Sequence, residues 1–203
     1  KKQGARFMTF ADLRRGQFPS PGEFGVIVSF DDCLRDNYKN GLAVLAALDI
    51  RSVLFQSTAL IEAPTLIWEH ALYWYWHDER MRLLFSELVH ETFPGTRSMG
   101  EKTLLGHLIE ELPVKQLENL LRIMGDHQGS APVFSELASK VYPNERDILQ
   151  AHQAGHELAS HGHHHYMRKG IDTETMENEL RLSIEVLRRV VGVGPGAFSF
   201  PFP

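Results

Sequence analysis

The sequence predicts an α/β fold. Four short apolar segments lack the polar alternation of half-exposed strands, and such runs are typical of strands buried on both faces of a parallel sheet. Amphipathic helical patterns lie between these segments, and strands that alternate with helices favour an α/β architecture. The predicted strands cover residues 26–30, 52–56, 157–160 and 197–200.

Two amphipathic helices accompany these strands. The first is expected to be capped by Asp36 or Asn37, whose side chains suit that position. The second has the clearest helical pattern in the chain; it begins at Asp172 or Thr173 and ends before Gly192, a natural residue to follow a helix. The faces expected to be buried are Tyr38, Leu42, Leu45 and Leu48 in the first helix, and Met176, Leu180, Ile184, Leu187 and Val191 in the second.

A long helical stretch, residues 64–142, separates the second predicted strand from the third. A strand-to-strand crossover needs far fewer residues. We therefore expect an inserted α-helical subdomain or lid, with residues 1–63 and 143–203 forming the α/β part. The insertion contains a stretch rich in Trp and Tyr, residues 68–76, which could stack on sugar rings, although such stretches more often form core.

Composition limits the class of protein. With 203 residues, 43% of them hydrophobic, the chain can bury a sizeable core, and its single cysteine, Cys33, cannot form a disulfide within the chain. A net charge of −5 argues against a nucleic-acid partner. The apolar runs are too short to span a membrane, and no secretory signal is visible, which favours the cytoplasm.

Two acidic residues, Asp31 and Asp32, follow the first predicted strand. Adjacent acids at the end of a buried strand are costly unless they are paired or bind a cation. Successive side chains point to opposite sides, so the two carboxylates can serve different purposes. The dipeptide taken alone favours a helix cap and a surface acid, because Asp is common at such strand-to-helix turns. The cysteine that follows them, Cys33, has no histidine close by in sequence to activate it as a nucleophile.

Histidine is concentrated after the third predicted strand: of 11 histidines in the chain, four fall in residues 161–165. His161 and His165 are four residues apart, which puts both imidazoles on one face of a helical turn and suits a shared metal ion. The pair His161 and His164 satisfies the same argument, so spacing leaves the choice open. A carboxylate would complete a His₂-Asp set of the kind found at catalytic zinc. The alternative is a solvated, histidine-rich loop.

Three segments, in this order, resemble the motifs of the polysaccharide deacetylase family, the carbohydrate esterases that share the NodB-homology domain. Residues 29–33, Ser-Phe-Asp-Asp-Cys, are similar to the first motif, Thr-Phe-Asp-Asp-Gly. Residues 160–165, Ser-His-Gly-His-His-His, resemble the second motif, His-[Ser/Thr]-x-x-His, and residues 198–202, Phe-Ser-Phe-Pro-Phe, resemble the third. The resemblance covers about 26–62 and 145–203 and leaves out the inserted helices.

The resemblance implies a fold, an activity and a site. The fold would be a distorted (β/α) barrel of the NodB-homology type, of which this chain supplies about half, so that the chain would be a fragment of a longer protein. The activity would be metal-dependent removal of N-acetyl or O-acetyl groups from a poly- or oligosaccharide, with zinc, or else cobalt, nickel or manganese, as the ion. The implied site residues are Asp31 as general base, Asp32, His161 and His165 as metal ligands, and Pro201 and Phe202 as the floor of the cleft.

The chain also departs from the family pattern. Cys33 replaces a Gly, Gly162 replaces a Ser or Thr, and Tyr166 replaces a Pro, while the usual general acid would lie beyond Pro203. These departures favour an alternative hypothesis, a catalytically silent deacetylase-like domain that binds carbohydrate or a partner protein. A third hypothesis is a metal-binding or structural histidine site in an unrelated α/β domain.

Overall fold

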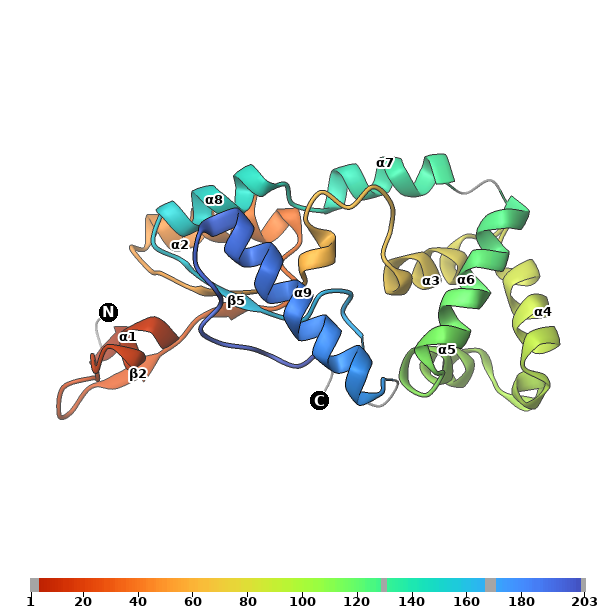
Figure 1. Ribbon diagram of the computed structural model, residues 1–203, viewed down its shortest axis with the longest axis horizontal. Helices are drawn as coiled ribbons and strands as arrows, with labels where there is room; N and C mark the ends of the chain where they lie inside the picture. The colour runs from red at the N-terminus through yellow and green to blue at the C-terminus, as the bar shows by residue number, and fades with distance from the viewer. Residues whose placement is uncertain (1–3, 129–130, 167–170, 202–203) are drawn as a thin grey trace. The chain divides into compact units, whose positions relative to one another are not determined.

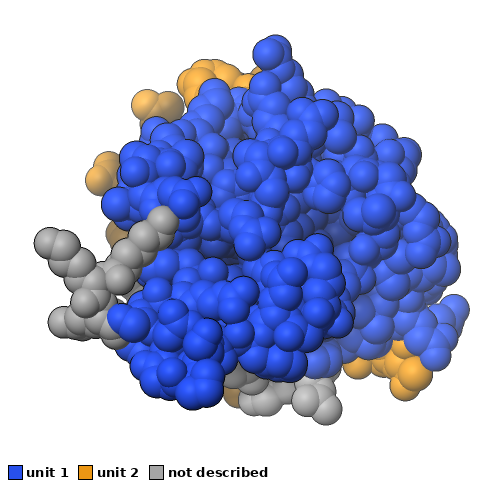
Figure 2. Space-filling view, turned by 90° about the vertical axis from the view of Figure 1, so that its left-hand side faces the viewer, with its two compact units in different colours: residues 1–62, 141–165, 174–203 blue, residues 63–140, 166–173 orange. Residues whose placement is uncertain are grey.

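The computed structural model describes residues 4–128, 131–166 and 171–201 (Figure 1). The chain divides into two compact units, which Figure 2 colours separately. Unit 1 contains Lys1–Glu62, Val141–His165 and Glu174–Pro203, and unit 2 contains Ala63–Lys140 and Tyr166–Thr173. Among the described residues, no helix combines the length and the apolar character that crossing a membrane requires.

Unit 1 is built around a parallel sheet. Its strands, β3 (Ser29–Phe30), β4 (Val53–Gln56) and β5 (Glu157–Ser160), lie in the order β3-β4-β5. Beyond β5, Phe198 forms an isolated parallel bridge with Ser160. The parallel strands and the helices packed on them confirm the predicted α/β class. Over the described residues the sheet is open and does not close into a barrel.

Both faces of this sheet are buried, as its unalternating apolar strands predict. On one face, Leu54 and Leu158 belong to a cluster that draws its other members mainly from three helices. These helices are α2 (Leu42–Ala47), α8 (Glu145–Gln153) and α9 (Thr173–Val191). On the opposite face, the buried residues Val53, Phe55 and Ala159 pack with Phe10, Ile27 and Ala197.

The prediction of one continuous strand over residues 26–30 is wrong. Its beginning belongs to β2 (Phe24–Val26), which pairs with β1 (Ala5–Phe7) in a separate two-stranded parallel sheet. Only its end, β3, joins the main sheet, where the Val53 amide donates to the Val28 carbonyl at 2.9 Å. A short helix, α1 (Phe10–Arg14), lies between β1 and β2. Periodicity could not find this division, because one apolar run supplies partners to two sheets.

Three smaller expectations are also wrong. The strand predicted at 197–200 is reduced to the bridge at Phe198. The helix predicted after residue 36 begins as a π-helical turn, Asn37–Gly41, and Asp36 has helical backbone angles without a capping hydrogen bond from its side chain. Leu48, expected on the buried face, is 55% exposed because the helix has already ended.

Helix α9 has the predicted bounds but a different buried face. Gly192 follows its last turn with φ of +81°, the left-handed conformation expected there. The face that is buried carries Glu179, Ser183, Leu187 and Val190. Of the apolar residues predicted to be buried, only Leu187 is fully buried. The reason is that two polar residues, Glu179 and Ser183, contact the loop after β5 and the end of β5.

Unit 2 consists of helices around an aromatic core. Tyr75 is 1% exposed; its ring stacks on Phe85 at a centroid distance of 5.9 Å and meets Phe134 edge-on at 5.3 Å. The Trp- and Tyr-rich stretch is therefore mostly core, and Tyr73, 39% exposed, is its outward member. The elements of this region are η2 (Thr58–Leu60) just before it, then α3 (Trp68–His77), α4 (Arg82–Thr92), η3 (Pro94–Ser98), α5 (Glu101–Glu110), α6 (Val114–Gln128) and α7 (Ala131–Val141).

Candidate metal centre

The chemistry-bearing residues of unit 1 gather at the carboxyl ends of its parallel strands. Asp31 and Asp32 directly follow β3, Gln56 ends β4, and residues 161–165, here called the histidine loop, directly follow β5. Because the strands are parallel, these ends lie at the same edge of the sheet. Open α/β sheets and α/β barrels place their ligand sites at this edge.

Three side chains converge there. The Oδ1 atom of Asp32 lies 3.4 Å from His161 Nε2 and 2.9 Å from His165 Nε2. The three atoms all lie within 4.8 Å of one another. Both histidines are buried, whereas the Asp32 side chain is half exposed, so the group is reached from the aspartate side. His164, the alternative partner that spacing allowed, turns its Nδ1 to Glu179 instead.

The histidine loop is not the helical turn that its spacing suggested. Gly162 and His165 both have left-handed backbone angles, with φ of +84° and +60°, which no helix contains. The loop is held from outside by the amides of η2, since Thr58 N donates to Gly162 O at 3.1 Å and Ala59 N donates to His163 O at 2.9 Å. The two imidazoles are therefore brought together by an irregular loop, and residues just after the neighbouring strand β4 support this loop. A side chain at position 162 would be strained by the backbone itself.

The turn that carries Asp32 is strained. Asp32 and Cys33 have φ of +60° and +59°, which costs non-glycine residues about 1–3 kcal/mol each. Gln56, fully buried, donates from Nε2 to the Asp32 carbonyl at 3.3 Å and accepts from the Tyr38 hydroxyl at 2.7 Å. Strain of this kind persists where surrounding contacts fix it, and it clusters at functional sites. Sequence reasoning missed Gln56, and its signal was a polar residue at the end of an apolar strand.

The residues present fit a divalent cation. His161 Nδ1 lies 2.9 Å from the Ser199 carbonyl oxygen, which can only accept, so Nδ1 carries a proton and Nε2 is the atom that faces Asp32. The two imidazoles, His161 first, hold the pKa of the Asp32 carboxyl well below its ordinary value against the effect of burial, so this group is anionic at neutral pH. Each Nε2 faces an anionic oxygen, and the attraction between them requires a positive charge, either a proton on the ring or a bound cation. Two histidines and one aspartate are a ligand set of catalytic zinc.

A buried acid on α9 supports the histidine loop. The Glu179 carboxylate accepts from the amides of His163 at 3.0 Å and His164 at 2.6 Å, and its other oxygen lies 2.6 Å from His164 Nδ1. One turn later, Ser183 Oγ lies 2.7 Å from Ser160 Oγ. Sequence reasoning missed both residues, because it assigned the buried face of this helix by hydrophobicity.

Cys33 is a core residue. It is fully buried in the cluster on the helix-covered face, and burial, helped by the charges of Asp32 and Asp31, raises the pKa of its thiol well above the ordinary value. A protonated, inaccessible thiol is a poor nucleophile. The left-handed angle at this position suits the glycine of the family motif, and Cys33 adopts it with strain.

We predict that Cys33 reacts with an aromatic disulfide reagent at least ~10²-fold more slowly in the folded protein than in urea, because reaction requires local unfolding. The absorbance of the released thiolate measures the rate. Ser98→Cys, at an exposed position, is the control and should add one rapidly reacting thiol. Rapid modification of the folded wild-type chain would contradict the buried position.

Pro201 is buried, and its Cγ lies 3.9 Å from where a Cβ on Gly162 would stand, so it packs beside the histidine loop. The other residue expected at the floor of the cleft, Phe202, lies outside the described residues.

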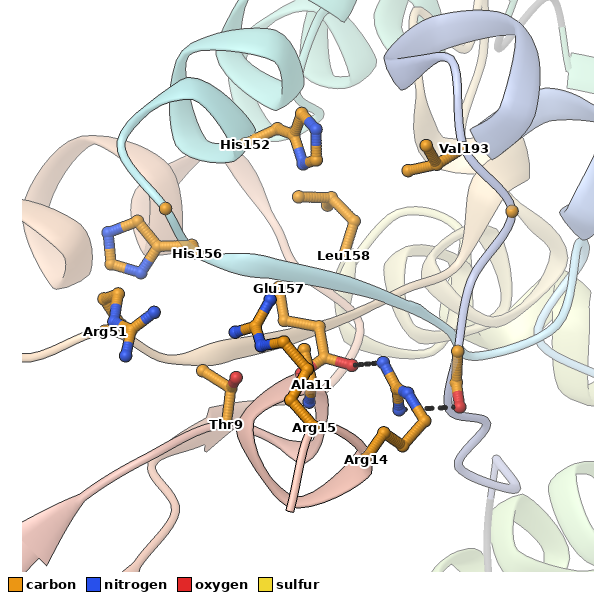
Figure 3. A pocket seen from close by; sticks show the side chains of 13 residues that line it. Thr9, Ala11, Arg14, Arg15, Arg51, His152, His156, Glu157, Leu158 and Val193 are labelled. Atoms are coloured by element: carbon orange, nitrogen blue, oxygen red, sulfur yellow. Dashed lines mark hydrogen bonds and ion pairs between the residues drawn. The ribbon is translucent and has the colours of Figure 1, made fainter. Parts of the chain in front are cut away.

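A separate cavity of about 300 Å³ lies at the amino-terminal edge of the sheet (Figure 3). Its charged side chains are paired: Arg14 donates to Glu157 at 2.7 Å and to the Gly196 carbonyl at 2.9 Å, and Arg51 pairs with Asp12 at 3.1 Å. Buried His156 accepts from the Ser52 amide. These contacts join α1 to the sheet, so the charged side chains around the cavity have a structural role.

Comparisons with known proteins bear on the family and the fold of this chain. The family model for polysaccharide deacetylases matches residues 102–202, a range that contains the histidine loop and Pro201 but not Asp31 or Asp32. The fold is similar to that of the BpsB deacetylase domain from Bordetella bronchiseptica, with a TM-score of 0.53 at 14% sequence identity. That comparison covers 98% of this chain and 64% of the other, so this chain spans somewhat less than two thirds of that structure. No match was found among curated protein sequences.

Proposed function

The chain belongs to the polysaccharide deacetylase family, and from this premise we propose that it is a metal-dependent hydrolase that removes N-acetyl or O-acetyl groups from a poly- or oligosaccharide. The observation that carries the proposal is the convergence of Asp32, His161 and His165 at the carboxyl edge of the sheet. In the same proposal, residues 1–63 and 143–203 form half of a distorted (β/α) barrel, and residues 64–142 form an inserted helical subdomain.

The proposed metal ligands are Asp32, His161 and His165. A divalent ion, zinc or else cobalt, nickel or manganese, supplies Lewis acidity when bound, polarising the acetyl carbonyl and lowering the pKa of water. The Ser199 carbonyl fixes the tautomer of His161, so that its Nε2 is available as a ligand. Gln56 and the turn it supports hold the Asp32 backbone in place.

Asp31 is the proposed general base. It is exposed and directly precedes the ligand Asp32, yet its carboxylate is not among the three atoms that converge. The two acids lie in a tight turn, closed by the Cys33 amide donating to the Asp31 carbonyl at 2.6 Å. Asp31 is thereby available to accept a proton from the attacking water. Pro201, with Phe202, is proposed to line the floor of the substrate cleft.

The departures that favour a silent domain have structural explanations here. Gly162 occupies a backbone conformation that suits glycine, and the Glu179 carboxylate and the Ser160 hydroxyl hold the loop around it. Cys33 lies in the core and does not enter the group of ligands. Both observations support the enzyme over the carbohydrate-binding alternative.

The test is acetate release from N-acetylated and O-acetylated oligosaccharides by the chain, before and after treatment with a chelator. We expect release that the chelator abolishes and that added zinc, cobalt, nickel or manganese restores. A chain that binds one equivalent of metal but releases no acetate from any substrate would be the silent domain. A chain that binds no metal would contradict the proposed site altogether.

A further inference from the structure

The Glu179 carboxylate is directed at the backbone between the two candidate histidine ligands. Its Oε2 accepts two of the intervening amides, those of His163 and His164, and its Oε1 contacts His164 Nδ1. Residues 163 and 164 are two of the three residues that link His161 to His165. A group that fixes their amides therefore fixes the separation of the two ligand rings, whose centroids lie 5.0 Å apart.

The position of this acid is unusual for a helix of unit 1. Glu179 is 5% exposed and shares its face with Leu187 and Val190, which pack into the core. Burying a carboxylate is costly unless hydrogen bonds compensate for lost hydration. All three contacts that compensate come from the histidine loop. The acid is thus matched to this loop and to no other described part of unit 1.

We propose that Glu179 is a positioning residue of the metal centre, which holds the histidine loop so that His161 and His165 present their Nε2 atoms to one point. The inference rests on the proposed function, since it assumes that these atoms bind a metal ion. Glu179 itself is not a ligand, because both of its oxygens are engaged by the loop. Metal sites require their ligands to be held within about 0.5 Å of the productive geometry, and a loop with two left-handed residues needs support to achieve this.

Zinc affinity, measured by competition with a chromophoric chelator, tests the proposal. Glu179→Ala should weaken zinc binding by about 10–100-fold, the usual effect of removing a group that orients a ligand. Glu179→Gln should fall between this variant and the wild type, because its single carbonyl oxygen can still accept from the loop amides. The visible spectrum of the cobalt-loaded protein should change in both variants, since the arrangement of the ligands is altered.

Three controls separate positioning from general stability. Glu177→Gln makes the same charge change at an exposed position of the same helix and should leave the affinity unchanged. Leu187→Ala, on the same buried face but away from the loop, should lower stability towards urea without lowering zinc affinity. His164→Ala removes one of the three contacts and should weaken binding less than Glu179→Ala does.

Wild-type zinc affinity and an unaltered cobalt spectrum in Glu179→Ala would overturn the proposal. Equal losses of affinity in Glu179→Ala and Leu187→Ala would overturn it too, because they would show only a structural role. If Glu179→Ala does not fold, Glu179→Gln, of nearly the same size, decides by the same two measurements. Failure of the wild-type chain to bind zinc is a different result and contradicts the proposed function instead.

Discussion

Asp31→Asn is expected to lower turnover of an acetylated oligosaccharide by about 10²–10⁴-fold while the metal stays bound, because a positioned general base contributes this much. The substitution keeps the size of the side chain and removes only its ability to take a proton. Asp31 lies outside the group formed by Asp32, His161 and His165, so metal content should not change. Acetate release and elemental analysis of the same preparation measure the two quantities.

Asp36→Asn is the matched control for this substitution. Asp36 is an exposed acid five residues further along the chain, and it accepts from Asn40 Nδ2 at 2.5 Å. An asparagine there retains an acceptor oxygen, so turnover should stay within about twofold of the wild type, as for most surface changes. Equal loss of activity in both variants would indicate a nonspecific effect of charge and contradict the role of Asp31.

The sheet of unit 1 was largely predictable from the sequence because its strands are buried on both faces. Residues 53–56 and 157–160 are apolar runs with clear ends, and the structure makes them β4 and β5. The region around residues 24–30 was not predictable in the same way. There the chain passes from one sheet to another within a single apolar run, and the choice of partner depends on residues far away in sequence.

The residue types of the candidate site were predictable from the sequence, but the residues that hold them in place were not. Asp32 and the histidines stand out by residue type, and the structure brings Asp32, His161 and His165 together. Spacing left His164 and His165 both open, the family resemblance implied His165, and the contact of the His164 ring with Glu179, on another element, agrees with that choice. Gln56 and Glu179 were missed for one physical reason. A buried polar residue is recognised by its hydrogen-bond partners. Here the main partners are backbone and side-chain groups far away in sequence, which no local pattern reveals.

Asp32→Ala is expected to weaken metal binding by at least ~10-fold, because it removes one of three protein ligands. The two histidines remain buried, and the Ser199 carbonyl still orients His161, so residual binding through His161 and His165 should persist. Turnover should fall in parallel with occupancy, and an excess of metal should restore part of it. The same excess should restore nothing in Asp31→Asn, whose site is already filled. Chelator competition gives the affinity, and acetate release at several metal concentrations gives the rescue.

This contrast tests the assignment of the two neighbouring acids. Asp32 lies 2.9 Å from His165 Nε2, whereas Asp31 contributes no atom to the converging group. If Asp31→Asn loses the metal while Asp32→Ala keeps it, the two roles are exchanged. If both variants keep full metal content and full activity, neither acid takes part in the reaction and the deacetylase mechanism proposed for this chain is wrong. Only metal loss in Asp32→Ala, together with a filled but slow Asp31→Asn, agrees with one acid as ligand and the other as base.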